Sequence, residues 1–362
     1  MACLDPRPPG LLGQKRLFIV GSMVAGLVTL LFLFWIVLRI DGARVTDAVD
    51  DIGELIAALW AALMCGVAAR RVSVGRTSWL LLAASSFAWA VGEALWSYYD
   101  LVQGVQVPFP SWADAGFLAA IPLACAGLLL FPSSRQRTAH RVTSLLDGCI
   151  IATTMLFASW ATILGPLYRS HQGSVLKQSI SLAYPVSDVV MVSLVVILIA
   201  RVGRQGWTSL GLVMTGLVAF AVADSSFSYL TEVNNYGSGN FLDTGWVAGY
   251  LLIGLGALWA LTSPPRHVEQ TEASTVSLVA PYLPVLVVLA VTSIQLLRGR
   301  HINPVAWAMA LVLVVLVLGR EVLRLRDKAN VLHRLADTIQ TTAGGDTDSG
   351  YRGRTHVPES VT

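Results

Sequence analysis

The chain has 362 residues, of which 55% are hydrophobic and 13% are charged, and its mean hydropathy is +0.65. A soluble domain carries about a quarter charged residues, so this composition excludes an ordinary soluble protein. The net charge of +3 at pH 7 does not indicate a surface that binds nucleic acid. Charges are confined to short breaks between apolar stretches, each near the roughly 20 residues that a bilayer requires. The sequence therefore predicts an all-α, polytopic membrane bundle whose main partner is the lipid bilayer.

Ten apolar stretches follow one another along the chain. They cover residues 17–39, 52–69, 78–99, 112–131, 145–167, 179–200, 207–231, 243–262, 278–297 and 303–320. We expect four regions: an N-terminal tail over 1–16, a transmembrane bundle over 17–320, a coiled-coil-like helix over 321–341 and a tail over 342–362. The last region is rich in Gly, Ser and charged residues, so it is predicted to be disordered.

The basic residues predict the orientation of these stretches. With the N-terminus inside, 19 of the 25 Lys and Arg residues fall in inner segments and the rest fall in outer ones, as the positive-inside rule requires. Both termini are then cytoplasmic, and we expect the protein in the plasma (inner) membrane of a bacterium. The first stretch is too long for a signal peptide, so we expect it to remain as an anchor.

Two segments of the sequence occur in similar form twice. FAWAVGEALWSY from Phe87 returns as VAFAVADSSFSY from Val218, which is 131 positions later. ADAGFLAAIPLACAGL from Ala113 returns as LDTGWVAGYLLIGLGA from Leu242, at an offset of 129. These offsets span four stretches, an even number, so the copies have the same orientation. The pattern predicts a parallel internal repeat of stretches 3–4 and 7–8, related by an axis along the membrane normal.

Each copy carries acidic residues in or beside its apolar stretches. An ionisable residue at membrane depth is costly and by default marks a functional site. With this orientation the polar side chains of the outer half gather at one level, and they predict an outward-facing cavity for a ligand or an ion. The candidate binding residues are Glu93, Asp114, Tyr184, Asp188, Asp224 and Asp243. The alternative is that these acids bond to polar neighbours and only fix helix packing.

Pro185 lies between two of these candidate residues, Tyr184 and Asp188. A proline inside a helix removes a backbone hydrogen bond and usually kinks the helix. Pro185 is therefore a candidate hinge, with a passive kink as the alternative. No metal site and no cofactor is expected, because neither the four cysteines nor the six histidines have the spacing or depth of a metal or haem site.

The apolar pattern continues beyond the last stretch. Steps of three and four residues connect Val322, Leu325, Leu332 and Ile339 through two alanines, which is the heptad seam of a coiled coil. We expect this seam to form a homodimer through those four residues and to transmit a movement from the bundle. The alternative is a helical end that only stops the membrane span.

Three segments carry a resemblance to a known family. They are Asp147 after a basic loop, AYPVSDVV from Ala183, and ADSSFSYL from Ala223 followed by YGSGNFLDTGWVAGYLLIGLGAL from Tyr236. Together they resemble the multi-helix membrane input region that precedes GGDEF and EAL domains in bacterial cyclic-di-GMP signalling proteins. The resemblance covers about 290 residues. It implies a membrane fold, a sensory or regulatory role and a signalling helix that leads to a dimerising domain.

The chain departs from that family where a catalytic domain would begin. The segment AGGDT from Ala343 is not a GGDEF motif, and no EAL, kinase or protease signature occurs, so no enzyme is expected. A cytoplasmic signalling partner encoded separately would then supply the output. The predicted function is a membrane sensor or regulator that binds a ligand or ion and relays the event through its C-terminal helix. The alternative is a secondary transporter or ion-coupled carrier, which parallel repeats and intramembrane acids also fit.

Overall fold

The structure, a computed structural model, describes residues 11–72, 75–131, 138–165, 168, 174–201, 207–232, 238–262, 283–297, 299 and 304–348. All regular secondary structure in these residues is helical, which confirms the predicted all-α class. The elements are α1 (Leu11–Leu38), α2 (Ala43–Arg71), α3 (Arg76–Ser97), η1 (Tyr98–Val102), α4 (Trp112–Leu129), α5 (Thr138–Ser159), η2 (Trp160–Leu164), α7 (Val175–Arg201), α8 (Trp207–Glu232), η4 (Phe241–Asp243), α9 (Thr244–Thr262), α11 (Leu283–Leu297) and α12 (Pro304–Asp348).

Eight of the described helices are long and apolar enough to cross a membrane. They are α1, α2, α3 with η1, α4, α7, α8, η4 with α9, and the first half of α12. Each of the ten predicted stretches falls on a helix over its described residues. The apolar part of α5, Leu146–Ser159, continues directly into η2, which ends at Leu164. The described α11 has 15 residues, fewer than the roughly 20 that span a bilayer at 1.5 Å per residue, and residues 278–282 before it lie outside the described part of the chain.

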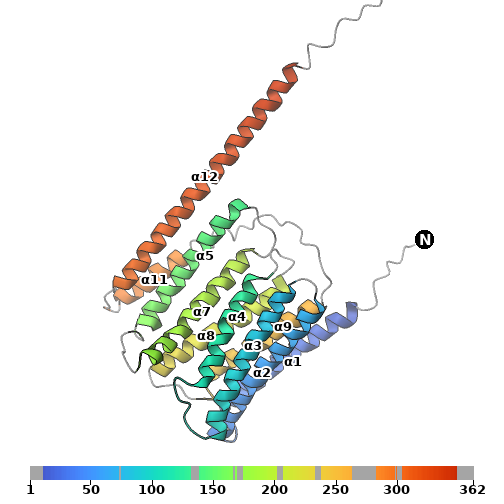
Figure 1. The fold of residues 1–362 in the computed structure, drawn as a ribbon, viewed down its shortest axis with the longest axis vertical. Helices are drawn as coiled ribbons and strands as arrows, with labels where there is room; N and C mark the ends of the chain where they lie inside the picture. Colours follow the sequence, from blue (N-terminus) through green and yellow to red (C-terminus); the bar gives the residue numbers. More distant parts are fainter. Residues whose placement is uncertain are drawn as a thin grey trace, which may run out of the picture.

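Six helices close into a ring through their contacts (Figure 1). Going around it, α2 packs on α3, α3 on α4, α4 on α7, α7 on α8, α8 on α9, and α9 returns to α2. Outside the ring, α1 lies along α9, and α5 lies along α7. Trp89 of α3 holds the ring together from within. Its indole contacts the rings of Phe117 on α4 and Phe220 on α8, with centroids 4.3 and 4.4 Å apart, and lies 6.1 Å from Tyr250 on α9.

The α3–α4 and α8–α9 pairs pack through glycine at corresponding places. A Cβ added to Gly116 would lie 2.6 Å from the backbone N of Gly92, and one added to Gly245 would lie 2.8 Å from Cβ of Ala223. Gly92 and Ala223 are 131 positions apart, and Gly116 and Gly245 are 129 apart, as in the duplicated segments. Small residues let the backbones of membrane helices approach closely, so these two helix pairs have the same packing register.

The last helix projects from the bundle. α12 runs without a break from Pro304 to Asp348 and extends far beyond the end of α5 (Figure 1). Its first half packs with α5 and α11 in a small separate core that contains Ile150, Phe157, Val288 and Leu313. At the edge of this core, Arg320 is 2% exposed and forms an ion pair with Asp147 of α5.

Two predicted boundaries differ from the structure. Residues 342–348 were expected in a disordered tail, but they continue α12; residues 349–362 lie outside the described part of the chain. Adding a residue to an existing helix costs little compared with starting one, so the two glycines at 344 and 345 do not end it. At the other terminus, α1 begins at Leu11, within the predicted 1–16 tail.

Candidate functional site

All six predicted binding residues are buried, and they come from one end of the ring. Asp114 and Asp243 lie at the starts of α4 and α9, Glu93 and Asp224 toward the ends of α3 and α8, and Tyr184 and Asp188 in the first half of α7. None of these side chains is more than 8% exposed. All six side chains are therefore enclosed by the ring helices in this structure.

The first group consists of Asp114 and Tyr184. Asp114 Oδ2 accepts a hydrogen bond from the backbone N of Ser111 at 2.6 Å and so caps the start of α4. Its other oxygen, Oδ1, accepts a hydrogen bond from the Tyr184 hydroxyl at 2.6 Å. Both oxygens of this buried carboxyl group thus have donors, and Asp114 fixes the packing of α4 on α7.

The second group consists of Asp188 and Asp224. The Ser225 hydroxyl donates to Asp188 Oδ2 at 2.8 Å, and the Asp188 and Asp224 carboxyl groups lie close enough for their charges to interact. Two carboxylates that share a buried place repel each other, and a proton on one of them removes the repulsion. The pair is a place where a proton can be held between α7 and α8.

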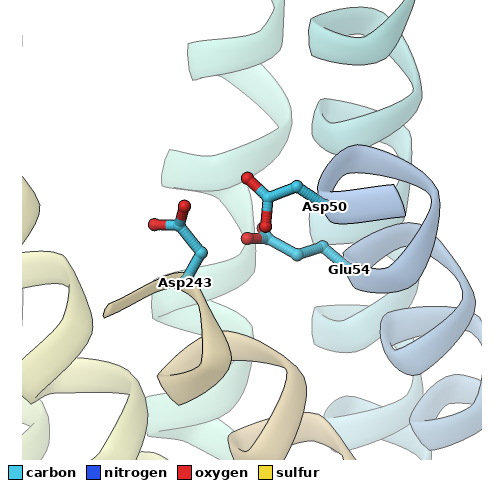
Figure 2. Close-up of side chains that lie close together, drawn as sticks. All are labelled: Asp50, Glu54 and Asp243. Atoms are coloured by element: carbon cyan, nitrogen blue, oxygen red, sulfur yellow. The ribbon is translucent and has the colours of Figure 1, made fainter. Parts of the chain in front are cut away.

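The third group joins Asp243 to two residues that were not among the candidates (Figure 2). Asp50 and Glu54 reach from one face of α2 toward Asp243, and one carboxylate oxygen of each lies within 4.8 Å of the others. All three side chains are buried. The backbone N of Gly239 donates to Asp50 Oδ2 at 2.7 Å, whereas Asp50 Oδ1 is buried without a hydrogen-bond donor among the described residues. These three residues, which we call the acidic triad, could hold a metal ion.

Glu93 and Asp51 lie beside the acidic triad. Glu93 is close enough to Glu54 and Asp51 for their charges to interact, and Asp51 Oδ2 is also buried without a donor in the described part of the chain. Tyr250 interacts electrostatically with Glu54, Glu93 and Asp224, so it lies between the triad and the Asp188–Asp224 pair. The structure thus gathers Glu93 with the triad, and it places Asp114 in a separate, satisfied contact.

Asp50 and Asp51 were missed because the predicted second apolar stretch begins only at residue 52, and Glu54, inside that stretch, was missed because it lies outside the duplicated segments. The helix itself begins at Ala43, so both aspartates lie within its first turns. A hydropathy pattern treats charged residues as breaks between helices, although a helix can continue through them. The i, i+4 spacing of Asp50 and Glu54, which puts both on one helix face, is the signal that could have identified them.

A hollow of about 460 Å³ also lies between α2 and α3, away from the acids. Its walls are apolar and include Leu59, Leu63, Leu80 and Phe87, all four of which are exposed large side chains. Such a surface suits contact with lipid acyl chains, and it offers no polar group to orient another ligand.

Comparison with known proteins gives no further guide to the site. No family model matches the chain, and no curated protein and no solved structure matches it either. The basis for a function is therefore the chemistry of the buried carboxyl groups and the arrangement of the helices that carry them.

Proposed function

We propose that this chain is an integral membrane sensor or regulator that binds a small cationic ligand at the buried acids and relays the event through α12. The observation that carries this proposal is the acidic triad, in which Asp50, Glu54 and Asp243 face one another and Asp50 Oδ1 has no donor among the described residues. Like charges brought together in a buried place favour a compensating positive charge. The resemblance to membrane input regions of cyclic-di-GMP signalling proteins supports the same role.

A parallel internal repeat is part of this proposal, and the packing supports a longer unit than the sequence predicted. The unit would be α2–α3–α4 matched by α7–α8–α9, because α9 contacts α2 just as α4 contacts α7. Ser111 and Asn240, 129 positions apart, start their helices with the same capping arrangement. A two-fold arrangement of three-helix units explains why the acids of both copies lie at one end.

The relay is supported by a continuous path of contacts from the acids to α12. Asp243 of the acidic triad directly precedes α9, α9 packs on α8, and α8 packs on α7. From there α7 packs on α5, and α5 packs on α12. The contact between α5 and α12 includes the buried ion pair of Asp147 and Arg320. A shift of α7 on ligand binding would therefore move α5 and, through it, the base of α12. Pro185, inside α7 and next to Tyr184, is the proposed hinge for that shift.

The output would be a homodimer formed through α12. In one copy, Val322 is 49% exposed and Leu325 is 64% exposed, and Leu332 and Ile339 continue the same seam in the sequence. Heptad seams bury such residues only against a partner helix. A second copy is the proposed occupant because a parallel pair of identical seams matches in register along its whole length. A separately encoded cytoplasmic partner would read the dimer.

Changing Leu325 to Asp is expected to abolish crosslinking between copies, because two charges would face each other across the seam. The measurement is disulfide crosslinking through a cysteine introduced at Ala329, an exposed position of α12, in a protein without native cysteines. Arg326→Asp is the matched control, since Arg326 is exposed beside the seam and this variant should crosslink normally. Equal crosslinking of the Leu325→Asp protein would reject the dimer.

The proposed topology has ten membrane crossings with both termini in the cytoplasm. A cysteine at Gln106, exposed in the loop before α4, is expected to react with an impermeant thiol reagent added outside intact cells. A cysteine at Ala329 is expected to react only after the cells are opened. In Figure 1 that loop and the free end of α12 lie at opposite ends of the molecule. Labelling of both positions from outside would overturn this orientation.

An ion-coupled carrier is the second candidate function. The observation that favours it is the Asp188–Asp224 pair, which can hold a proton between two helices of a repeat. Carriers with parallel repeats place their ion sites at such helix interfaces. Proton or cation flux in proteoliposomes that is lost in Asp224→Asn would support the carrier, whereas a protein that dimerises and moves no ion would support the sensor.

A further inference from the structure

We infer that Asp50, Glu54 and Asp243 form a binding site for one hard divalent cation of the Ca²⁺, Mg²⁺ or Mn²⁺ class. This inference identifies the ligand class of the proposed sensor. Only the effect of binding on α12 rests on the proposed function. The site itself is supported by the geometry of three carboxyl groups, by an oxygen without a donor and by a comparison of the two halves of the ring.

The spacing of the three carboxyl groups fits one ion. Their oxygens lie within 4.8 Å of one another. Ca²⁺ binds oxygen at about 2.3–2.6 Å, so two oxygens on opposite sides of one such ion are about 4.6–5.2 Å apart. Carboxylate oxygen is the donor that Mg²⁺, Ca²⁺ and Mn²⁺ prefer. The donors of the triad are three carboxylate oxygens. Cys65 of α2 lies three helical turns further along that helix, so its thiol is too far away to join them.

The second observation is the state of Asp50. Its side chain is only 3% exposed, and its Oδ1 has no hydrogen-bond donor in the described part of the chain. Figure 2 shows its carboxyl group turned toward the same space as those of Glu54 and Asp243. A buried carboxylate oxygen that accepts no hydrogen bond is costly, and a cation bound among the three groups would give Asp50 Oδ1 a partner.

In the other half of the ring, the residues that correspond to the triad are satisfied by protein groups alone. There, Tyr184 and Asp188 have the same i, i+4 spacing on α7 as Asp50 and Glu54 on α2. The residue that faces Tyr184 is Asp114, which corresponds to Asp243 and bonds back to Ser111, the capping residue of α4. In that half the Tyr184 hydroxyl donates to Asp114, so the capping carboxyl group is satisfied by protein alone.

The donor tyrosine of that half is replaced in the acidic triad. An aspartate, Asp50, stands where the tyrosine would be, four residues before Glu54 on α2. Helix packing alone would be served by a second tyrosine, whose hydroxyl would donate to Asp243. A carboxyl group in its place adds an acceptor where a donor would satisfy the capping group, and a bound cation would supply the missing positive charge.

A chain of partly exposed acids connects the triad to the surface. Asp47 at the start of α2 and Asp100 in η1 are half-buried and interact electrostatically with each other. Asp100 also interacts with Asp51, which is buried next to Asp50. Clefts lined by one sign of charge raise the local concentration of counter-ions. A divalent cation would therefore reach the site along this acidic edge of α2.

The test is Mn²⁺ binding to the purified full-length protein after treatment with a chelator, measured by electron paramagnetic resonance. The wild-type protein is expected to bind Mn²⁺ saturably and to release it when Ca²⁺ or Mg²⁺ is added. Asp50→Asn should weaken binding by about tenfold or more, because affinity follows the number of charged ligands. The matched control is Asp114→Asn, which removes a buried carboxyl group that protein donors already satisfy in the other half and should leave Mn²⁺ affinity unchanged.

Thermal unfolding separates loss of the site from loss of the fold. The side-chain amide that Asp50→Asn introduces can donate a hydrogen bond to a neighbouring carboxyl group. Metal-free Asp50→Asn protein should therefore unfold at a higher temperature than metal-free wild type, and added Ca²⁺ should not raise it further. Absence of saturable Mn²⁺ binding to wild type, or equal loss in Asp50→Asn and Asp114→Asn, would overturn the inference.

The two proposals fail in different ways. If wild type binds no Mn²⁺ but crosslinks through α12, the metal site is wrong and the dimeric output stands. If Mn²⁺ binds with the expected dependence on Asp50 but never changes the crosslinking of α12, the metal site stands and the relay is wrong.

Discussion

Replacing Asp147 by alanine is expected to lower the free energy of unfolding by about 3 kcal/mol, the lower end of the cost of breaking a buried ion pair. Arg320 is 2% exposed and is held between α5 and α12, where it pairs with Asp147 and with Oε1 of Glu321 at 2.8 Å. Without Asp147, its buried charge loses a carboxylate partner. The α5–α12 contact should then loosen at the base of the projecting helix.

The reverse change, Arg320→Ala, should cost less, because the Asp147 side chain is 29% exposed and water can solvate it. Arg324→Ala is the control. Arg324 is 27% exposed and lies 3.6 Å from Glu321, and surface pairs of this kind contribute about 0–1 kcal/mol. Denaturant or thermal unfolding in nanodiscs measures all three. A double variant with Asp147→Arg and Arg320→Asp should recover part of the loss. Equal, small effects of Asp147→Ala and Arg324→Ala would show that the buried pair does not hold α12.

Replacing Gly116 by alanine is expected to destabilise the ring by about 1–3 kcal/mol, the usual cost of overpacking a core. A Cβ at this position would lie 2.6 Å from the backbone N and 2.7 Å from Cα of Gly92, and 2.8 Å from the carbonyl O of Ala88. All three atoms belong to the backbone of α3, so no side chain can move aside and the two helices must separate. Glu93, next to Gly92, would move with α3.

Two comparisons make this result specific. Gly245→Ala, at the matching place between α8 and α9, should cost less, because its nearest atom is the Cβ of Ala223 at 2.8 Å and the Ala219 carbonyl O lies at 3.3 Å. Gly66→Ala and Gly211→Ala add a methyl group with no described atom within 4 Å, so they should be neutral or slightly stabilising, since alanine favours the helix more than glycine does. Thermal unfolding checks the order. A Gly116→Ala protein as stable as Gly66→Ala would contradict the close packing.

Much of the fold could be predicted from the sequence because the bilayer imposes it. In lipid each backbone N–H and C=O group must bond within its own segment, so apolar stretches become helices. The ten stretches fall on helices for this reason. The capping of α4 and α9 is equally local: Asp114 and Asp243 each lie three residues after a helix-capping residue and bond back to its backbone N. Their position at helix starts followed from the sequence alone.

Only the tertiary structure decided which helices meet. Asp50 and Asp243 are far apart in the sequence, and they share a site because α9 closes the ring against α2. The same holds for Asp147 and Arg320, which no pattern along the chain connects. Lipid tails are as apolar as the side chains of membrane helices, so hydrophobicity does not select which helices pair. Pairing depends instead on how small residues such as Gly116 fit the facing helix. That fit depends on the three-dimensional shape of two helix surfaces, and the hydropathy pattern along the sequence does not predict it.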